Sequence, residues 1–305
     1  MPRSINYRPF LIDELITNER LNSYASVFKH ADDVELVGAY IWNMHVCASL
    51  YPLLTTVEVT LRNSIDTALT KSLGRFWWSQ NRLHYKSFSH GGNEPFVVSA
   101  IKQNFSKAYD QVRRDKRDRY SIRNARPTHH EIIAKTEFST WEFILDHEFM
   151  GPNLIWPSRL GSVFRGVWPT SRAANMLSST KDLVKTIREF RNRVSHHEPV
   201  WKRFSVHTEQ DAITHLHEKI DKIKQLISLI SPEKEQLIMR SGLLSSAERM
   251  CSISELRRFQ HNVETIKIKS IAKLSKLSQK ASDENAVKKI VLYKYGKTQF
   301  LLHPA

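Results

Sequence analysis

The apolar residues of this chain recur mostly with the spacing of an α-helix. The clearest stripe lies within residues 34–73 and contains Leu50, Leu54, Val57, Leu61, Ile65 and Leu69. Because residues three and four apart share a face of a helix, this spacing predicts a long helix with one buried side. Weaker patterns predict helices over 10–30, 96–119 and 172–197. The expected fold class is therefore all-α.

Capping signals predict where further helices begin. Ser139 and Glu142 have the spacing of a capping box, which predicts a helix that starts there. A similar polar segment at 208–211 predicts the start of an amphipathic helix. Ser231 followed by Pro232 predicts another start, with serine as the N-cap and proline in the first turn.

Segments rich in Gly, Pro and Trp interrupt these patterns. Residues 74–98 and 153–169 are predicted to be irregular on that ground. The alternating stretch at 290–303, centred on a Tyr-Gly-Lys triplet, predicts a short C-terminal β-hairpin.

The domain organisation expected from these breaks has two parts. Residues 1–230 form the main helical domain, with a basic insertion at about 74–170, and residues 231–305 form a basic helical C-terminal extension. A chain of 305 residues with 41% hydrophobic residues is long and apolar enough for a substantial core.

Charge is the second strong feature of the sequence. The formal net charge is +15, which favours a polyanion such as nucleic acid or an anionic membrane as partner. No run approaches the roughly 18 apolar residues that a membrane-spanning helix needs. The first residues lack the apolar region of a signal peptide, and Cys47 and Cys251 resemble buried thiols rather than a disulfide. We therefore expect a cytoplasmic protein without a membrane partner.

Two segments hold much of the positive charge. Residues 102–126 contain nine Lys and Arg against three Asp, and residues 257–297 contain eleven against three acidic residues. Phe105, Tyr109 and Tyr120 lie among the first group, and aromatic side chains beside cations suit unpaired bases. A solvated helix face is the alternative interpretation of either segment. The residues expected to bind RNA are Lys102, Lys107, Arg113, Arg114, Lys116, Arg117, Arg119, Arg123, Lys273, Lys276 and Lys280.

The residues with the clearest chemical potential lie at the end of the helix predicted over 172–197. Its buried face is predicted to contain Leu183, Ile187, Phe190 and Val194. Arg191 and His196 would lie about 140° apart around a regular helix, since each residue turns ~100°, whereas Asn192 shares a face with His196. A helix C-terminus favours a protonated imidazole, so His196 could hold and release a proton near neutral pH. A proton-transfer group beside a guanidinium suits phosphodiester chemistry.

These residues also support a resemblance to known proteins. Arg191, Asn192 and His196 match the R-x4-H signature of HEPN-domain ribonucleases, and the longer segment at 191–199 resembles the Abi-like (AbiD/AbiF) abortive-infection proteins. A second similar segment lies upstream, at residues 40–43 and 56–63. The resemblance covers about residues 10–230.

The resemblance implies a HEPN-type helical bundle and a metal-independent endoribonuclease toxin of bacterial phage defence. Such an enzyme would cleave RNA by attack of the ribose 2′-hydroxyl, at a composite site formed by two copies of the chain. His196 would move the proton, Arg191 would bind the scissile phosphate, and Asn192 would orient His196 or hold the interface. Supporting roles would fall to His197, Glu198, Glu58, Arg62 and Asn63.

The same resemblance implies partners as well as chemistry. It implies a homodimer or a larger even oligomer, restrained by a small structured RNA, and no cofactor. Two other functions stay open: a non-catalytic RNA-binding protein of the same fold, and a toxin controlled by a protein antitoxin.

Within the motif, His197 is the rival of His196 for the catalytic role. Glu58 and Arg62, four residues apart, could form a structural ion pair instead of serving the site. Metal catalysis is disfavoured because the histidines lack H-E-x-x-H spacing and no cysteine pair resembles a zinc site. The sequence also contains no phosphate-binding Gly-rich loop and no Gly-x-Ser-x-Gly nucleophile elbow.

Overall fold

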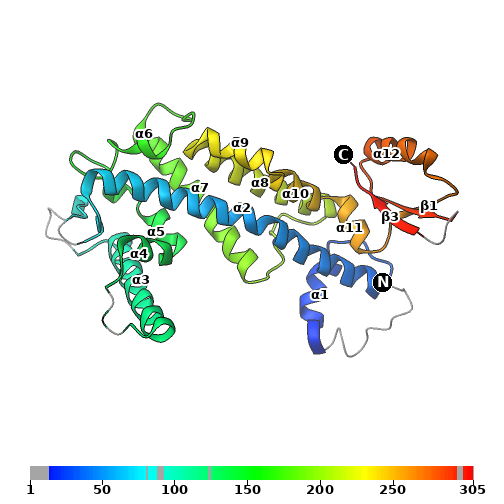
Figure 1. Cartoon of the computed structure of the whole chain (residues 1–305), viewed down its shortest axis with the longest axis horizontal. Helices are drawn as coiled ribbons and strands as arrows, with labels where there is room; N and C mark the ends of the chain where they lie inside the picture. The colour runs from blue at the N-terminus through cyan, green and yellow to red at the C-terminus, as the bar shows by residue number, and fades with distance from the viewer. Residues whose placement is uncertain are drawn as a thin grey trace. The chain divides into compact units, whose positions relative to one another are not determined.

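The computed structural model describes residues 14–79, 82–87, 93–122, 124, 126–293 and 298–304. Helices make up most of this part of the chain, and the strands are confined to one small sheet near the C-terminus (Figure 1). The predicted fold class is therefore confirmed.

The helices follow one another along the whole described chain. Their bounds are α1 Asn18–Ala25, α2 Asp33–Leu73, α3 Phe96–Tyr120, α4 His129–Lys135, α5 Phe138–Phe143, η3 His147–Phe149, α6 Leu160–Val163, α7 Ala173–Ser195, α8 Glu209–Ile230, α9 Pro232–Arg240, α10 Leu243–Met250, α11 Ile253–Phe259, η4 Ile271–Lys273 and α12 Leu274–Asp283. The strands are β1 Glu264–Ile268, β2 Lys288–Leu292 and β3 Thr298–Leu302.

The chain forms two compact units, each assembled from separated segments. Unit 1 combines residues 1–50, 196–220 and 244–305, and unit 2 combines residues 51–195 and 221–243. The division into domains predicted at residue 230 stays a prediction.

Aromatic residues form the centre of unit 1. The ring of Trp201 meets Tyr24 edge-on at 5.2 Å and Phe28 at 4.7 Å between ring centroids. Phe28 also meets Trp42 at 5.4 Å, and the Trp42 indole donates to the Met250 carbonyl at 2.9 Å. All four rings are fully buried, so the N-terminal helices and the segment after α7 share one core.

The strands of unit 1 form a three-stranded sheet in the order β1-β2-β3, with α12 over it (Figure 1). β2 and β3 pair in antiparallel fashion, with Ile290 opposite Phe300, which confirms the predicted hairpin strands. The turn at 294–297 lies outside the described residues. β1 pairs in parallel with β2, and this strand was not predicted, because its partner in the sheet lies beyond a whole helix in the sequence.

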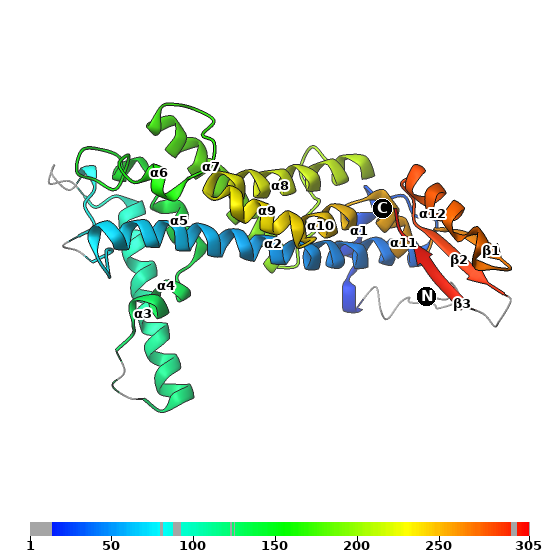
Figure 2. The same ribbon diagram turned by 45° about the horizontal axis from the view of Figure 1, so that its top comes forward.

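Unit 2 is built around a second aromatic core. Trp77 meets Phe105 at 5.3 Å, and Trp78 stacks flat on Phe105 at 4.1 Å. In the two views α4 lies along α3 (Figures 1 and 2), and Trp141 of α5 closes the same cluster. The second half of α2 supplies a buried stripe to this unit, as its spacing predicted.

The predicted starts of α8 and α9 are confirmed. Of the helix predicted over 10–30, the first residues lie outside the described part of the chain, and α1 begins at Asn18 and ends at Ala25. Thr208 caps α8 by accepting from the Asp211 amide at 3.1 Å, and Ser231 caps α9. The capping box predicted at Ser139 and Glu142 is wrong, since α5 begins one residue earlier and ends at Phe143. Glu142 is buried and pairs with Arg188 of α7, which removes its carboxylate from the helix start.

Candidate functional site

Helix α7 ends two residues earlier than predicted, and this places the motif histidine just beyond the helix. Ile187, Phe190 and Val194 are buried as expected. Leu183 is only partly buried, and the neighbouring Val184 occupies the buried position instead. His196 is the first residue after Ser195, so it belongs to the turn that follows the helix rather than to its last turn.

Arg191 is held from α2 within unit 2. Its Nε lies 3.3 Å from Oε2 of Glu58, and Nη1 donates to the Asn192 amide oxygen at 3.5 Å. Because Glu58 engages the Nε side of the guanidinium, the Nη groups keep N–H donors for an anion. The Glu58 side chain is 17% exposed and that of Arg191 is 37% exposed, so solvent reaches the cation.

Arg62 does not form the ion pair with Glu58 that their spacing predicted. Its Nη1 instead donates to the Ala134 carbonyl at 3.4 Å, and its Nε reaches the Asn63 amide oxygen at 3.5 Å. Arg62 therefore links α2 to the C-terminal turn of α4, while Glu58 is left to Arg191. The direct role that was open for Arg62 and Asn63 stays a prediction.

The turn after α7 is fixed by two side chains of unit 1. Asn43, which is buried, donates from Nδ2 to the Glu198 carbonyl at 3.2 Å and accepts from the Val200 amide at 3.1 Å. Arg20 donates to the carbonyl of His197, whose φ of 56° lies in the left-handed region. The amide of Asn43 thus supplies one donor and one acceptor to the backbone of this turn.

The two side chains of the histidine doublet face solvent. His196, His197 and Glu198 are all exposed, and within the described part of the chain the His196 ring makes no hydrogen bond. The roles of Asn43 and Arg20 were missed from the sequence. The signal for Asn43 was its place in the upstream segment at 40–43.

The basic residues of α3 divide into paired and unpaired cations. Lys102 pairs with Glu94, Lys116 with Glu131, Arg117 with Asp118, and Lys107 more loosely with Glu137. Arg113, Arg114 and Arg119 form no ion pair with any described residue, and Arg113 packs over the Tyr109 ring. Arg123 lies outside the described residues.

The C-terminal cations divide in the same way. Lys280 lies 3.6 Å from Glu264 and 3.7 Å from Glu284, beside the buried Lys288. Lys273 and Lys276 are exposed and unpaired among the residues the structure describes. The charge available to a polyanion is therefore smaller than the sequence count indicates.

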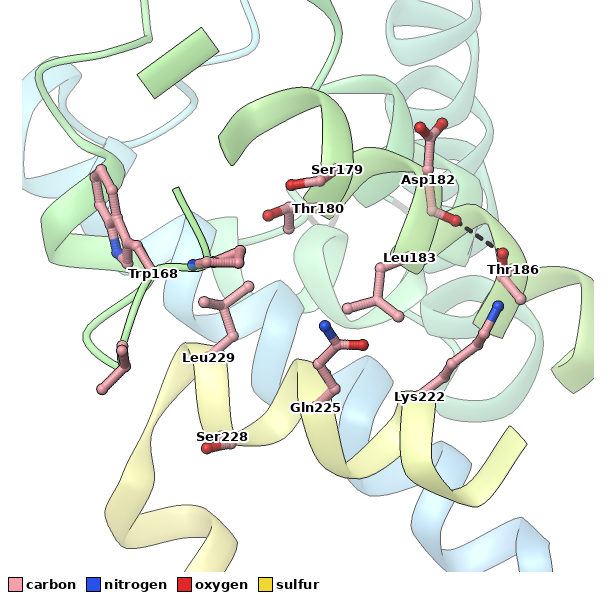
Figure 3. Close-up of a pocket in the computed structure, with 12 residues that line it drawn as sticks. Trp168, Ser179, Thr180, Asp182, Leu183, Thr186, Lys222, Gln225, Ser228 and Leu229 are labelled. Carbon is pink, nitrogen blue, oxygen red and sulfur yellow. Dashed lines mark hydrogen bonds between the residues drawn. The ribbon is translucent and has the colours of Figure 1, made fainter. Parts of the chain in front are cut away.

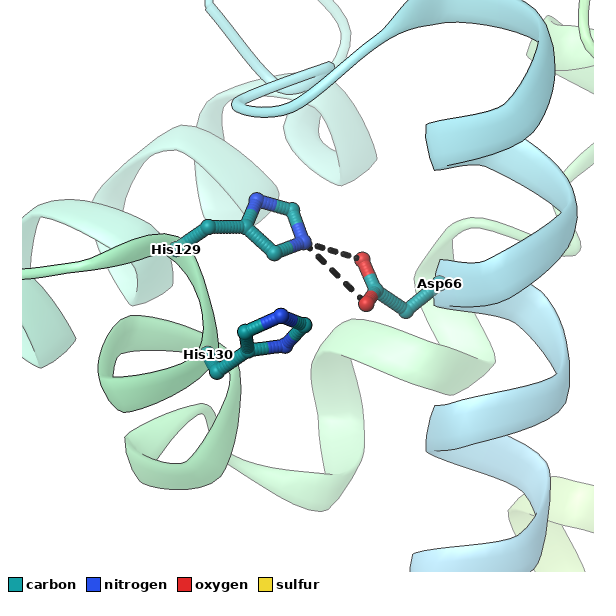
Figure 4. Close-up of side chains that lie close together, drawn as sticks. All are labelled: Asp66, His129 and His130. Atoms are coloured by element: carbon teal, nitrogen blue, oxygen red, sulfur yellow. Dashed lines mark hydrogen bonds and ion pairs between the residues drawn. The ribbon is translucent and has the colours of Figure 1, made fainter.

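A second histidine doublet, His129 and His130, lies in unit 2. Together with Asp66 it forms a cluster of side chains of metal-ligating types (Figure 4). His129 Nε2 lies 3.0 and 3.1 Å from the two oxygens of Asp66. The Phe76 amide donates to Nδ1 of the same ring at 3.1 Å, so Nδ1 is the acceptor and Nε2 carries the proton. Neither nitrogen then has a lone pair for a cation, and the arrangement favours a buried hydrogen-bonded pair over a metal centre.

Comparison with known proteins adds one finding. The sequence model of the family described as Abi-like protein matches residues 13–202. No curated protein and no solved structure matches the chain.

None of the helices in the described part of the chain combines the length and the apolar character needed to cross a membrane.

Proposed function

Because the chain belongs to the Abi-like protein family, we propose that it is an endoribonuclease toxin of abortive-infection phage defence. Membership in the family suggests the defence role. The nuclease activity is inferred from the residues at the end of α7. The observation that carries it is a guanidinium oriented by Glu58, followed five residues later in the sequence by an exposed histidine.

Each motif residue has a defined task in the proposed reaction. His196 takes the proton of the ribose 2′-hydroxyl or returns one to the leaving 5′-oxygen. Arg191 binds the scissile phosphate through its Nη donors and stabilises the charge that develops on it. Asn192, whose amide oxygen meets Arg191, supports the guanidinium. The reaction needs no metal and leaves a 2′,3′-cyclic phosphate.

We further propose that two copies of the chain form each site, as the resemblance implies. A two-fold axis brings the same surface of both copies together, so the α7 C-termini would face each other. Size measurement in solution should show a dimer or a larger even assembly. A monomer that cleaves RNA at nanomolar concentration would contradict the composite site.

RNA is the proposed partner on grounds of charge. The cations that remain unpaired, namely Arg113, Arg114, Arg119, Lys273 and Lys276, are the contacts we assign to phosphates. A small structured RNA bound there would restrain the toxin. The matched test replaces Arg113, Arg114 and Arg119 by Gln in one variant and the paired Lys102, Lys116 and Arg117 by Gln in another.

The two variants should differ in their dependence on salt. Loss of three phosphate contacts should flatten the plot of log affinity against log salt by about 2, at ~0.7 per single-strand contact. Loss of three paired cations should change that slope less. Equal slopes in both variants would favour the solvated-face interpretation.

The nuclease proposal is tested with Arg191→Ala and His196→Ala. Each should abolish toxicity in cells and cleavage of RNA by the purified protein, while circular dichroism and the melting temperature stay those of the wild type. His130→Ala, in the other doublet, is the control and should keep full activity. Retained RNA binding without cleavage by the wild type would favour the non-catalytic alternative.

A further inference from the structure

A partly open cavity of about 500 Å³ lies on unit 2, on a different face of α7 from Arg191. It is bordered by α7, by residues 222–229 of α8 and by the segment at 167–169 (Figure 3). Its size falls within the range of small-ligand pockets, ~300–1,000 Å³. Trp168 and Lys222 lie at its two ends, with Leu183 and Gln225 between them (Figure 3).

The end of the cavity that contains Trp168 is held in place by contacts within the protein. The Gly166 amide donates to the Leu229 carbonyl at 2.9 Å, and a Cβ on Gly166 would lie 2.1 Å from the Ser228 carbonyl oxygen. Because Gly166 has no Cβ, the backbone at this residue can contact the last turn of α8 directly. The Trp168 indole donates to the Phe164 carbonyl at 2.8 Å, which fixes the ring in place.

The opposite end offers polar groups without partners. Lys222 makes no ion pair and Gln225 no hydrogen bond with any described residue. The Thr186 hydroxyl donates to the Asp182 carbonyl at 2.9 Å, so its oxygen can still accept. The Asp182 carboxylate is directed away from Lys222 (Figure 3). A fixed aromatic ring, an amide and a cation within one cavity suit a planar group with an anionic attachment.

We propose that this cavity binds one unpaired nucleotide of an RNA strand. The base lies against Trp168 and Leu183, its edge meets the Gln225 amide, and its phosphate meets Lys222. A base within a duplex stays stacked and cannot enter, so the site selects single-stranded segments. The proposal rests on the proposed function for the identity of the polyanion, and it adds a contact that sets where the strand lies.

The test measures binding of a short single-stranded 2′-O-methyl oligoribonucleotide, which 2′-hydroxyl attack cannot cleave, to the full-length protein by calorimetry. Trp168→Ala should weaken binding about tenfold, since stacking of one base on an aromatic ring is lost. Trp168→Phe keeps a ring and should stay within about threefold of the wild type. Thermal melting of each variant confirms that the fold is intact.

The cation is tested with a matched pair on α8. Lys222→Gln should weaken binding and lower the salt slope by about 0.7, whereas Lys224→Gln, which lies outside the cavity lining, should leave both unchanged. Equal effects of the two lysine variants, or wild-type affinity in Trp168→Ala, would overturn the assignment while leaving the proposed nuclease untouched.

Two competition experiments distinguish an RNA strand from a free nucleotide or free phosphate as the ligand. A free nucleoside monophosphate should compete only weakly, and inorganic phosphate should not compete. A mononucleotide that binds as tightly as the oligonucleotide would show a free-nucleotide site and overturn the strand proposal. If the wild type binds no RNA at all, the proposed function fails together with this inference.

Discussion

The His129-His130 doublet opens a helix in unit 2, whereas the His196-His197 doublet follows the end of one. His129 is buried, and both of its ring nitrogens are engaged by Asp66 and the Phe76 amide. His196 is exposed, and the groups around it hold the backbone instead of the ring. In the first doublet His129 therefore belongs to the buried framework, whereas in the second doublet both side chains are exposed.

The difference arises from what anchors each doublet. A buried imidazole must satisfy its polar atoms within the protein, and once Asp66 and a backbone amide have done so the ring has no free position. The polar atoms of an exposed imidazole can instead form hydrogen bonds with water or with a ligand. At the second doublet the backbone turn is held by Asn43, which bonds to the Glu198 carbonyl and the Val200 amide and not to the His196 ring.

The largest effect is expected from breaking the buried pair. Asp66→Ala or His129→Ala should lower the free energy of unfolding by about 3 kcal/mol, because each removes a member of a buried network in which Asp66 accepts from both His129 and the Trp77 indole. His130→Ala and His196→Ala, at exposed positions, should change it by less than about 0.5 kcal/mol. Urea unfolding of the four variants measures this. Similar losses at His129 and His196 would erase the contrast between the doublets.

A smaller effect is expected at the anchor of the second doublet. Asn43→Ala should lower the free energy of unfolding by about 1–2 kcal/mol, since the buried Val200 amide and the Glu198 carbonyl both lose a partner. Asn43→Asp keeps the acceptor for Val200 and should fall between the alanine variant and the wild type. RNA cleavage should decline in the same order, at temperatures where every variant is folded. Unchanged cleavage in Asn43→Ala would show that the turn needs no anchor.

The anchor of Arg191 should matter for activity more than for stability. Glu58→Gln removes a partly exposed ion pair, which is worth less than about 1 kcal/mol to folding. Cleavage should still fall several-fold in kcat/KM, because the guanidinium loses the carboxylate that orients it. Glu189→Gln removes a carboxylate two residues from Arg191 on the exposed side of α7 and serves as the control. Equal kinetics in the two variants would contradict the positioning role.

The smallest expected effect is on the pH dependence of stability. It arises at the start of α4, the helix that contains His129. The Lys116 ammonium and the Thr128 amide lower the pKa of Glu131 from the ordinary 4.5 to about 2. A carboxyl whose pKa is lower in the folded state stabilises the fold above pH 4.5, and this contribution is lost as the pH falls toward 2. Glu131→Gln should therefore flatten the stability profile across that window. A profile identical to that of the wild type would show that the capping box contributes no pH dependence.

The long helices could be predicted because their signals are local. The stripe of α2 and the caps of α8 and α9 depend on residues three or four apart, and these elements match the structure closely. The capping box at Ser139 failed because a tertiary partner, Arg188, takes the carboxylate that the pattern assigned to the helix start. Strand β1 was missed because its pairing with β2 joins residues separated by a whole helix.

The candidate site shows the same limit. Arg191 and His196 could be proposed from one short segment, but the residues that hold Arg191 and the turn after α7 come from distant parts of the chain. Glu58 pairs with Arg191 rather than with Arg62, and Asn43 reaches a turn more than 150 residues away. Helix spacing alone favours the near partner. The choice between near and distant partners is made by packing, which a single sequence does not reveal.

In the proposed reaction the exposed doublet cleaves RNA without a metal. The most direct measurement is the chemistry of the RNA ends produced by the purified protein in EDTA. The wild type and His130→Ala should produce a 2′,3′-cyclic phosphate and a 5′-hydroxyl, and His196→Ala should give no products. Products with a 3′-hydroxyl and a 5′-phosphate that require added metal, or unchanged cleavage by His196→Ala, would contradict it.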